Sequence, residues 1–320
     1  MIGALELGII YAIVALGVYL TFRVLNFPDL TVDGSFTTGA AVAGALLILE
    51  VNPIVATLAA FFAGMIAGAI TGLLHTYGGI DGLLAGILTM IGLWSINLRI
   101  MGFAIGSTGT GNLGIARTEN LFTALRGDIL GTWWSIPLLL LGALAVKLLI
   151  DWFLATDLGL AMRATGNNEQ MIRAFGVDTY KTKILGLALS NGIVALGGAL
   201  IAQYNGFADI RMGIGLILIG LASVILGQVL VGNRFVWLAT VGVIVGAILY
   251  QLIIYAALSV GLDPNDMKLI SAIIVITALL LPRLGIGRKM FRSRRGTKPT
   301  NYTQVAADDE VAATTTVKGA

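Results

Sequence analysis

The 320-residue chain has no cysteine, one histidine and six prolines, and only 12% of its residues are charged. The absence of cysteine excludes disulfide bonds, thiol catalysis and thiolate metal sites. A single histidine is a poor basis for a catalytic or metal-binding cluster, so we expect neither. Soluble proteins carry about 25% charged residues. With half that share, the chain cannot cover a water-exposed surface, and a soluble fold is excluded.

Hydrophobic residues make up 57% of the chain, and its mean hydropathy is +0.93. A helix needs about 20 apolar residues to cross the hydrocarbon core of a bilayer. Runs of this length recur along the sequence and predict an all-α, polytopic bundle of about nine membrane spans. The expected spans are 2–22, 35–50, 53–74, 82–101, 133–154, 184–204, 214–231, 236–258 and 269–281.

The basic residues predict the orientation, because Lys and Arg in short loops stay on the cytoplasmic side. Most of the 20 lie on one side if the C-terminus is cytoplasmic, and an odd number of spans then places the N-terminus outside. We expect residues 1–286 to form the membrane domain and residues 287–320 a basic, then disordered, cytoplasmic tail. The basic residues from Arg283 to Lys298 are expected to contact anionic lipid headgroups and not nucleic acid.

A polar inner segment, residues 155–183, connects the fifth and sixth expected spans. It contains a short predicted helix with Asn167 as its N-cap and Gly176 as its stop. So short a helix needs a partner surface, which is either its own bundle or another protein. We favour docking to a cytoplasmic partner. The residues expected to dock are Arg163, Asn167, Glu169, Met171, Ile172, Arg173 and Phe175.

Polar residues near the break after the first span are candidates for a solute path, together with others in later spans. Such groups at membrane depth are costly unless they face water or protein. The alternative is that Asp29 and Asp33 cap the helix that follows them in a solvated loop. The candidates are Asn26, Asp29, Thr31, Asp33, Ser35, Asn97, Asn191 and Gln228.

The sequence Asn-Phe-Pro-Asp-Leu at residues 26–30 has a weak echo at residues 205–210, where Phe-Ala-Asp-Ile follows Asn and Gly. The two copies are five spans apart and would have opposite senses in the membrane. This is typical of transporters built from inverted repeats with interrupted helices. A chance match of two short segments is the alternative.

Several segments resemble permease subunits of the branched-chain amino acid family of ATP-driven importers, over most of residues 3–284. The segment FPDLTVDGSF, at residues 27–36, is similar to the corresponding segment of a sub-branch of this family that is associated with uptake of the aromatic amino acids tryptophan and tyrosine. The segments that carry the resemblance are GIIYAIVALG at 8–17, NFPDLTVDGSF at 26–36, LGLAMRA at 158–164, AFGV at 174–177 and LGGA at 196–199.

This resemblance implies a non-catalytic translocation subunit in the bacterial cell membrane. It would couple through residues 159–180 to a separate ATPase that binds ATP and magnesium, so we expect no cofactor on this chain. An extracytoplasmic substrate-binding protein would deliver the cargo, and a second permease subunit, expected to be another copy, would complete the path.

The chain's own residues agree with an external energy source, because the sequence contains no G-x-x-x-x-G-K-[ST] phosphate loop. The alternative function is an ion-coupled secondary transporter. Such carriers commonly bury acids in mid-span to bind the driving ion. Here Glu6, Glu50 and Asp151 lie near the ends of the expected spans, which disfavours that alternative.

Overall fold

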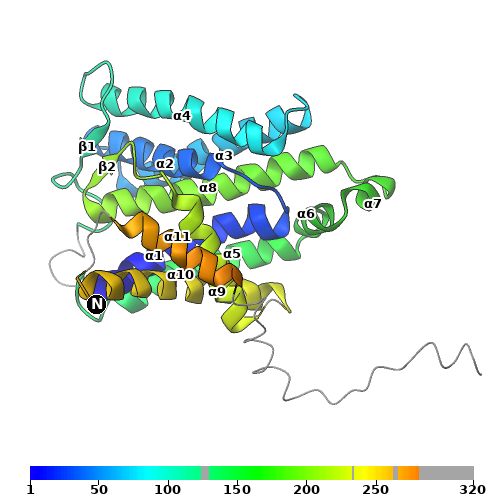
Figure 1. The fold of residues 1–320 in the computed structure, drawn as a ribbon. Helices are drawn as coiled ribbons and strands as arrows, with labels where there is room; N and C mark the ends of the chain where they lie inside the picture. Colours follow the sequence, from blue (N-terminus) through cyan, green and yellow to red (C-terminus); the bar gives the residue numbers. More distant parts are fainter. Residues whose placement is uncertain (124–129, 233, 262–265, 281–320) are drawn as a thin grey trace, which may run out of the picture. The chain divides into compact units, whose positions relative to one another are not determined.

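The structure is a computed structural model that describes residues 1–123, 130–232, 234–261 and 266–280 (Figure 1). Within these residues, seven helices are long and apolar enough to cross a membrane. They are α1 (Ile2–Tyr19, extended by the π-helical turn η1, Leu20–Val24), α2 (Thr31–Ile48), α3 (Pro53–Thr76), α4 (Gly82–Ala104), α5 (Ser135–Ala155), α8 (Thr179–Asn205) and α10 (Val236–Ser259).

Two shorter apolar helices, α9 (Leu216–Val231) and α11 (Met267–Leu280), match the seventh and ninth expected spans. The predicted class, a polytopic helical bundle, is therefore confirmed. Two starts were predicted too late, because α2 begins at Thr31 and α8 at Thr179. Hydropathy missed these polar first turns, which are helical through their backbone hydrogen bonds. The expected tail, residues 287–320, lies outside the described residues.

Helix α8 is central to the bundle and packs against α1, α2 and α3. Glycines permit this close packing, as is common between membrane helices. A Cβ atom at Gly64 or Gly68 of α3 would collide with backbone carbonyls of α8, and one at Gly39 of α2 would collide with the backbone of Ala195. By contrast, the outward faces of α3, α4 and α5 carry exposed large apolar side chains, as expected for contact with lipid.

The contacts between helices repeat along the chain. Helix α3 packs on α8 as α10 packs on α1, and α2 contacts α4 as α9 contacts α11. Each half of this scheme contains an interruption, and the two interruptions also match. The first break is residues 25–30, between η1 and α2, and the second break is residues 206–215, between α8 and α9. The carboxylate of Asp29 accepts a hydrogen bond from the backbone N–H of Thr31, and that of Asp209 accepts one from Arg211. These paired features support the predicted repeat.

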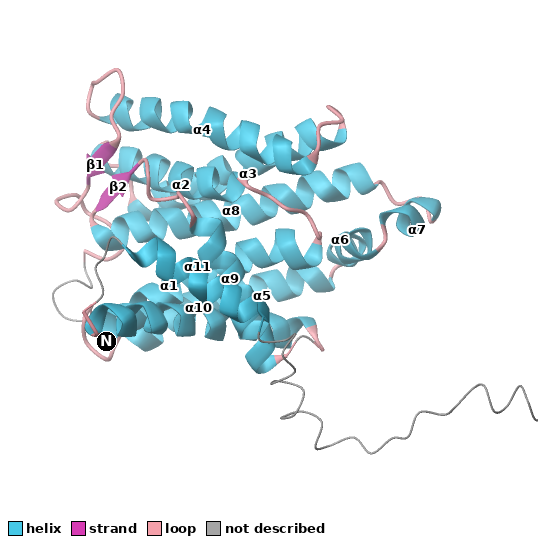
Figure 2. Ribbon diagram, viewed as in Figure 1, coloured by secondary structure: helices cyan, strands magenta, loops and turns pink. Residues whose placement is uncertain are grey.

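The two ends of the bundle differ (Figures 1 and 2). At one end, strand β1 (Asn112–Gly114) pairs antiparallel with strand β2 (Phe207–Asp209), which follows α8 directly. At the other end, two short helices, α6 (Asp157–Asn167) and α7 (Glu169–Ala174), lie between α5 and α8. We call α6 and α7 together the arm.

Candidate functional site

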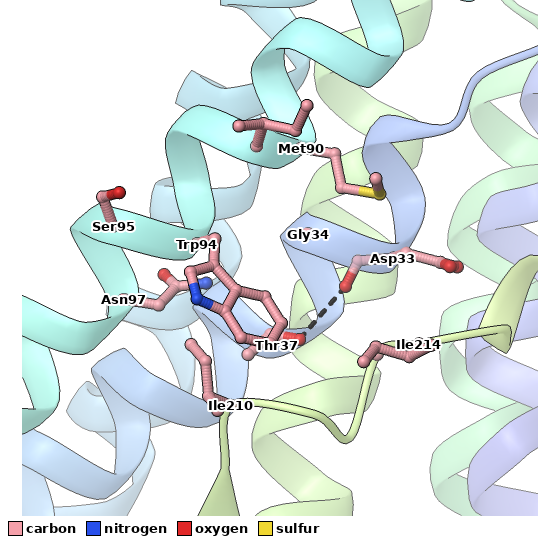
Figure 3. A pocket seen from close by; sticks show the side chains of 11 residues that line it. Asp33, Gly34, Thr37, Met90, Trp94, Ser95, Asn97, Ile210 and Ile214 are labelled. Atoms are coloured by element: carbon pink, nitrogen blue, oxygen red, sulfur yellow. Dashed lines mark hydrogen bonds between the residues drawn. The ribbon is translucent and has the colours of Figure 1, made fainter. Parts of the chain in front are cut away.

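A pocket of about 360 Å³ lies between α2, the middle of α4 and the segment that leads from β2 into α9 (Figure 3). It has an apolar wall of methionine, isoleucine and tryptophan side chains and a few polar groups, which is the usual composition of small-molecule sites. The residues that line it are Asp33, Gly34 and Thr37 of α2, Met90, Ile91, Trp94, Ser95 and Asn97 of α4, and Ile210, Gly213 and Ile214.

The segment from Ile210 to Gly215 is not a regular helix, so its backbone needs other partners at membrane depth. Backbone carbonyls serve the N–H groups of Ile210, Met212 and Ile214, and Asp33 serves the end of the segment. Asp33 Oδ2 accepts a hydrogen bond from the backbone N–H of Gly215, and its Oδ1 accepts one from Ile217, both at 2.9 Å. Asp33 therefore caps α9, where its negative charge complements the positive end of the helix. The alternative that Asp33 caps its own helix is wrong.

The break also requires glycine, for two different reasons. Gly215 has a φ of 85°, in the left-handed region that favours glycine. At Gly213, a Cβ atom would collide with the backbone carbonyl oxygen of Asp33 and meet the hydroxyl of Thr37. The two glycines thus let the chain turn sharply and lie directly against α2, which forms one wall of the pocket.

Asn97 is 1% exposed, and among the residues that the structure describes neither its Nδ2 nor its Oδ1 has a hydrogen-bond partner. Buried amide groups are normally paired. In Figure 3 the amide of Asn97 lies beside the indole ring of Trp94. Thr37, by comparison, donates its hydroxyl to the backbone of Asp33. The pocket wall therefore holds a buried donor and a buried acceptor without a partner among the described residues, and neither atom has appreciable accessible surface.

Asp29 lies outside the pocket and is fully buried. Its Oδ1 accepts a hydrogen bond from the backbone N–H of Thr31 at 2.9 Å, and its Oδ2 accepts one from Asn191 Nδ2 at 2.6 Å. The hydroxyl of Thr31 is 2.7 Å from that of Thr71. The first break is thus tied to α8 and α3. Asp29 bonds to the first residue of α2 as the capping alternative expects, but it does so in a buried site and not in a solvated loop.

The remaining expected path residues do not line the pocket either. Ser35 is buried, and its hydroxyl has no partner among the described residues. Asn26 is exposed at a φ of 53°, a conformation that asparagine tolerates better than most residues. Gln228 is half-buried in the last turn of α9. A role for these residues in the path stays a prediction.

In the arm, the N-cap of α7 is Asn168, whose Oδ1 accepts a hydrogen bond from the backbone N–H of Met171 at 3.0 Å. The prediction that Asn167 is the N-cap is wrong, because Asn167 is the last residue of α6, a helix the sequence did not lead us to expect. Gly176 follows α7 with a φ of 84°, consistent with its expected role as the stop.

Glu169 fixes α7 to α8. Its Oε1 accepts a hydrogen bond from Arg173 Nη2, and its Oε2 accepts one from Lys183 Nζ, both at 2.7 Å. Burial alone would raise the pKa of Glu169. The hydrogen bond and charge of Lys183, the hydroxyl of Thr179 and the charge of Arg173 outweigh burial and hold that pKa below its ordinary value.

The arm contacts η1 directly and is linked to the first break through Lys183 of α8 and His75 of α3. Lys183 Nζ is 3.5 Å from His75 Nε2 on α3, and the His75 ring packs edge-on against Phe27, with 5.0 Å between ring centroids. On α6, a Cβ atom at Gly166 would collide with the carbonyl oxygen of Val24, at the end of η1. Movement of the arm would therefore press directly on the residues that precede α2.

The outer surface of the arm, together with Phe175 directly after it, carries exposed apolar side chains among polar ones. No residue of α7 is buried, and Met171 is 46% and Phe175 77% exposed. Leu158 and Leu160 of α6 are also exposed, whereas Met162 on the opposite face is buried. Of the other residues expected to dock, Arg163, Asn167 and Arg173 are exposed and Ile172 is half-buried. The arm is thus fixed on one side and offers several exposed apolar side chains, set among polar ones, on the other.

Sequence reasoning missed Trp94, Thr37 and Met90 in the pocket, and Lys183 and His75 beneath the arm. The closely spaced Gly213 and Gly215 after Asp209 were a signal for the second break. No sequence signal pairs α4 with that break, because the contact is tertiary. Among the described residues, no group of three His, Asp or Glu side chains is placed to hold a metal ion.

Comparison with known proteins defines the class of this chain. Residues 1–280 match the family described as the permease component of the branched-chain amino acid transport system, and the chain belongs to this family. It is therefore an integral membrane permease of the ABC importer type. No solved structure gave a significant match.

The chain is similar to a tyrosine transport system permease protein of Clostridioides difficile (strain R20291), with 42% identity over 90% of this chain and 93% of the relative. It is 26% identical to the ribose import permease protein RbsC of Escherichia coli (strain K12), over 84% of this chain and 81% of that protein. The autoinducer 2 import system permease protein LsrC of Salmonella typhi is 29% identical over 75% of this chain and 64% of its own length.

Proposed function

We propose that this chain is the translocation subunit of an importer for an aromatic amino acid and that a separate ATPase drives it through the arm. The observation that carries the coupling is the arm itself, which is fixed to the bundle by Glu169 and exposes Met171 and Phe175. An exposed apolar helix face in an otherwise polar loop is suited to the groove of a partner protein. The aromatic cargo is supported by the similarity to the tyrosine permease.

The contacts below the arm supply a physical route for the coupling. Gly166 lies against the end of η1, and the Lys183–His75–Phe27 contacts reach the first break from the opposite side. A shift of α6 and α7 when the ATPase closes would move residues 24–30 and, through them, the start of α2. Asp33 lies on that first turn of α2, at the edge of the pocket.

The pocket supports a second permease subunit, which we propose is another copy. Trp94 is 40% exposed, Ser95 is exposed and Asp33 is half-buried, so the pocket opens on the outer face of α4. A second copy against α4 would cover this opening and enclose a path between the two subunits.

The remaining partners follow from this arrangement. An extracytoplasmic binding protein would deliver cargo at the end that carries β1 and β2, and the arm and C-terminus would be cytoplasmic. ATP and magnesium would bind the ATPase, and this chain would need no cofactor of its own.

The test is uptake of radiolabelled tyrosine into proteoliposomes that contain the permease, its ATPase and its binding protein. We expect uptake to require internal ATP and to be unaffected by ionophores that collapse ion gradients. Uptake that continues without ATP and stops with an ionophore would instead establish the ion-coupled carrier.

Phe175→Ser tests the arm, and Phe207→Ser is its matched control. Both phenylalanines are exposed, but Phe207 lies on β2 at the other end of the bundle. We expect Phe175→Ser to reduce recovery of the ATPase with the purified permease, while Phe207→Ser leaves it unchanged. Equal recovery with both variants would contradict docking through the arm.

A further inference from the structure

We propose that a groove between the C-terminal ends of α2 and α4 binds one phospholipid, with an acyl chain in the groove and the phosphate at Arg99. The groove has a volume of about 450 Å³ and shares no lining residue with the pocket at the middle of α4. The proposal goes beyond the proposed function and does not depend on it. The residues that line the groove are Val42, Ala45, Leu46 and Leu49 of α2 and Arg99, Ile100 and Phe103 of α4.

The walls of the groove suit a hydrocarbon chain. Every lining residue except Arg99 is apolar, so a polar solute would lose its hydrogen bonds to water and find few in return. Leu49 is 49% and Phe103 75% exposed, so the groove opens on the surface of the bundle. An acyl chain can therefore enter the groove sideways from the bilayer.

The groove lies where two spans end. Helix α4 has 23 residues, so it is about 35 Å long and crosses a hydrocarbon core of about 30 Å. Arg99 and Phe103 lie in its last two turns, and α2 ends at Ile48, beside the lining residues Leu46 and Leu49. One end of the groove is therefore close to the headgroup layer. A phospholipid places its phosphate and its chains in the same order along the membrane normal.

Arg99 requires an anion from outside the described part of the chain. Its side chain is exposed, and among the described residues no acid forms an ion pair with it. Lys147 on α5 provides the contrast, because its Nζ lies 2.6 Å from Asp151 Oδ2. A cation beside hydrocarbon is costly without such a partner.

A lipid phosphate supplies this partner. The guanidinium group of arginine binds phosphate through two N–H groups at once, and its long side chain can reach the headgroup layer. A free phosphate ion would use Arg99 alone and leave the apolar groove empty. The cation and the groove together therefore select an amphiphile that carries both a phosphate and a hydrocarbon chain.

Native mass spectrometry of the full-length permease, released from detergent micelles, tests the groove because it reports both the bound lipid and the number of subunits. The probes are dioleoylphosphatidylglycerol and dioleoylglycerol, which has the same chains and no phosphate. Arg99→Gln removes the charge, and its matched control is Arg117→Gln, an exposed arginine after β1. Leu46→Trp fills the groove, and its matched control is Leu141→Trp, an exposed residue of α5.

We expect each wild-type subunit to retain one molecule of the phosphatidylglycerol. Arg99→Gln should reduce this retention at least severalfold, Arg99→Lys should restore part of it, and Arg117→Gln should leave it unchanged. Leu46→Trp should also reduce retention, whereas Leu141→Trp should not. Dioleoylglycerol should be retained weakly and equally by the wild type and Arg99→Gln, a pattern that a general folding defect would not produce.

Retention of the phosphatidylglycerol that is unchanged in Arg99→Gln, or unchanged in Leu46→Trp, would overturn the proposal. A lipid-free dimer that dissociates in Leu46→Trp would also overturn it, because a second copy would then fill the groove. The assay involves neither ATP nor transport, so its failure is distinct from failure of the proposed function.

Discussion

The two breaks in the bundle use the same local device in different surroundings. In the first, Asp29 is fully buried and bonded to Thr31 and Asn191. In the second, Asp209 is 24% exposed on its side chain and bonds to Arg211 and Asn112. The first break is closed by α3 and α8, whereas the second continues into an irregular segment that lines a pocket.

This difference indicates how an inverted repeat can serve a transporter. The sealed break lies beside the arm and is suited to receive a displacement and pass it to α2. The open break contributes Ile210, Gly213 and Ile214 to the pocket and is suited to contact the solute. Asp33 joins the two, because it lies on the helix that follows the first break and caps the helix that follows the second.

The largest predicted difference between the two breaks is the loss of stability caused by Asp29→Ala compared with that caused by Asp209→Ala. Removing Asp29 takes away one of the two acceptors of the buried Asn191 Nδ2, which then donates only to the carbonyl of Leu187, at a cost of about 1–3 kcal/mol of stability. Removing Asp209 should cost less than about 1 kcal/mol, as expected for an exposed ion pair. The measurement is the melting temperature of each variant purified in detergent. Equal losses would show that the two breaks are equivalent in packing.

A comparable cost in stability, confined to the arm, is expected for Gly166→Ala. The added methyl group would collide with Val24 and displace α6 from η1, and overpacking of this kind costs about 1–3 kcal/mol. We expect reduced ATP-driven uptake with a normal amount of protein in the membrane.

The control is Gly142→Ala on α5, where a Cβ atom would meet no other atom within 4 Å. Its uptake should match the wild type. If Gly166→Ala also transports normally, the arm does not act through η1.

The smallest effect concerns Glu169→Gln and its dependence on pH. The pKa of Glu169 is lowered in the folded arm from its ordinary value of 4.5, so the carboxylate stabilises the arm fully above that value. The stabilisation is lost as the pH falls through the lowered pKa. Hydrogen exchange of α7 amides should be slower in the wild type than in the variant above pH 4.5. A difference that persists at lower pH would show that the charge of Glu169 is not responsible.

Much of the fold could be predicted from hydropathy, because a membrane helix must satisfy its own backbone and its length is set by the bilayer. The residues that line the solute path were harder to predict from the sequence. Asp33 and Asn97 were both expected there, but so were Asp29 and Asn191, which are hydrogen-bonded to each other in the packed interior. A polar residue in a span looks the same in sequence whether its partner is a protein group or a solute.

The helical class, the interruption after the first span and the short helix α7 are determined by the sequence alone, because each depends on local composition and backbone hydrogen bonding. The tertiary structure decided that Asp33 caps α9, that Asn97 has no hydrogen-bond partner in the described part of the chain and that Lys183 reaches Glu169 and His75. Each of these outcomes depends on which side chains from distant parts of the chain lie within hydrogen-bonding reach, and this is set by the packing of whole helices.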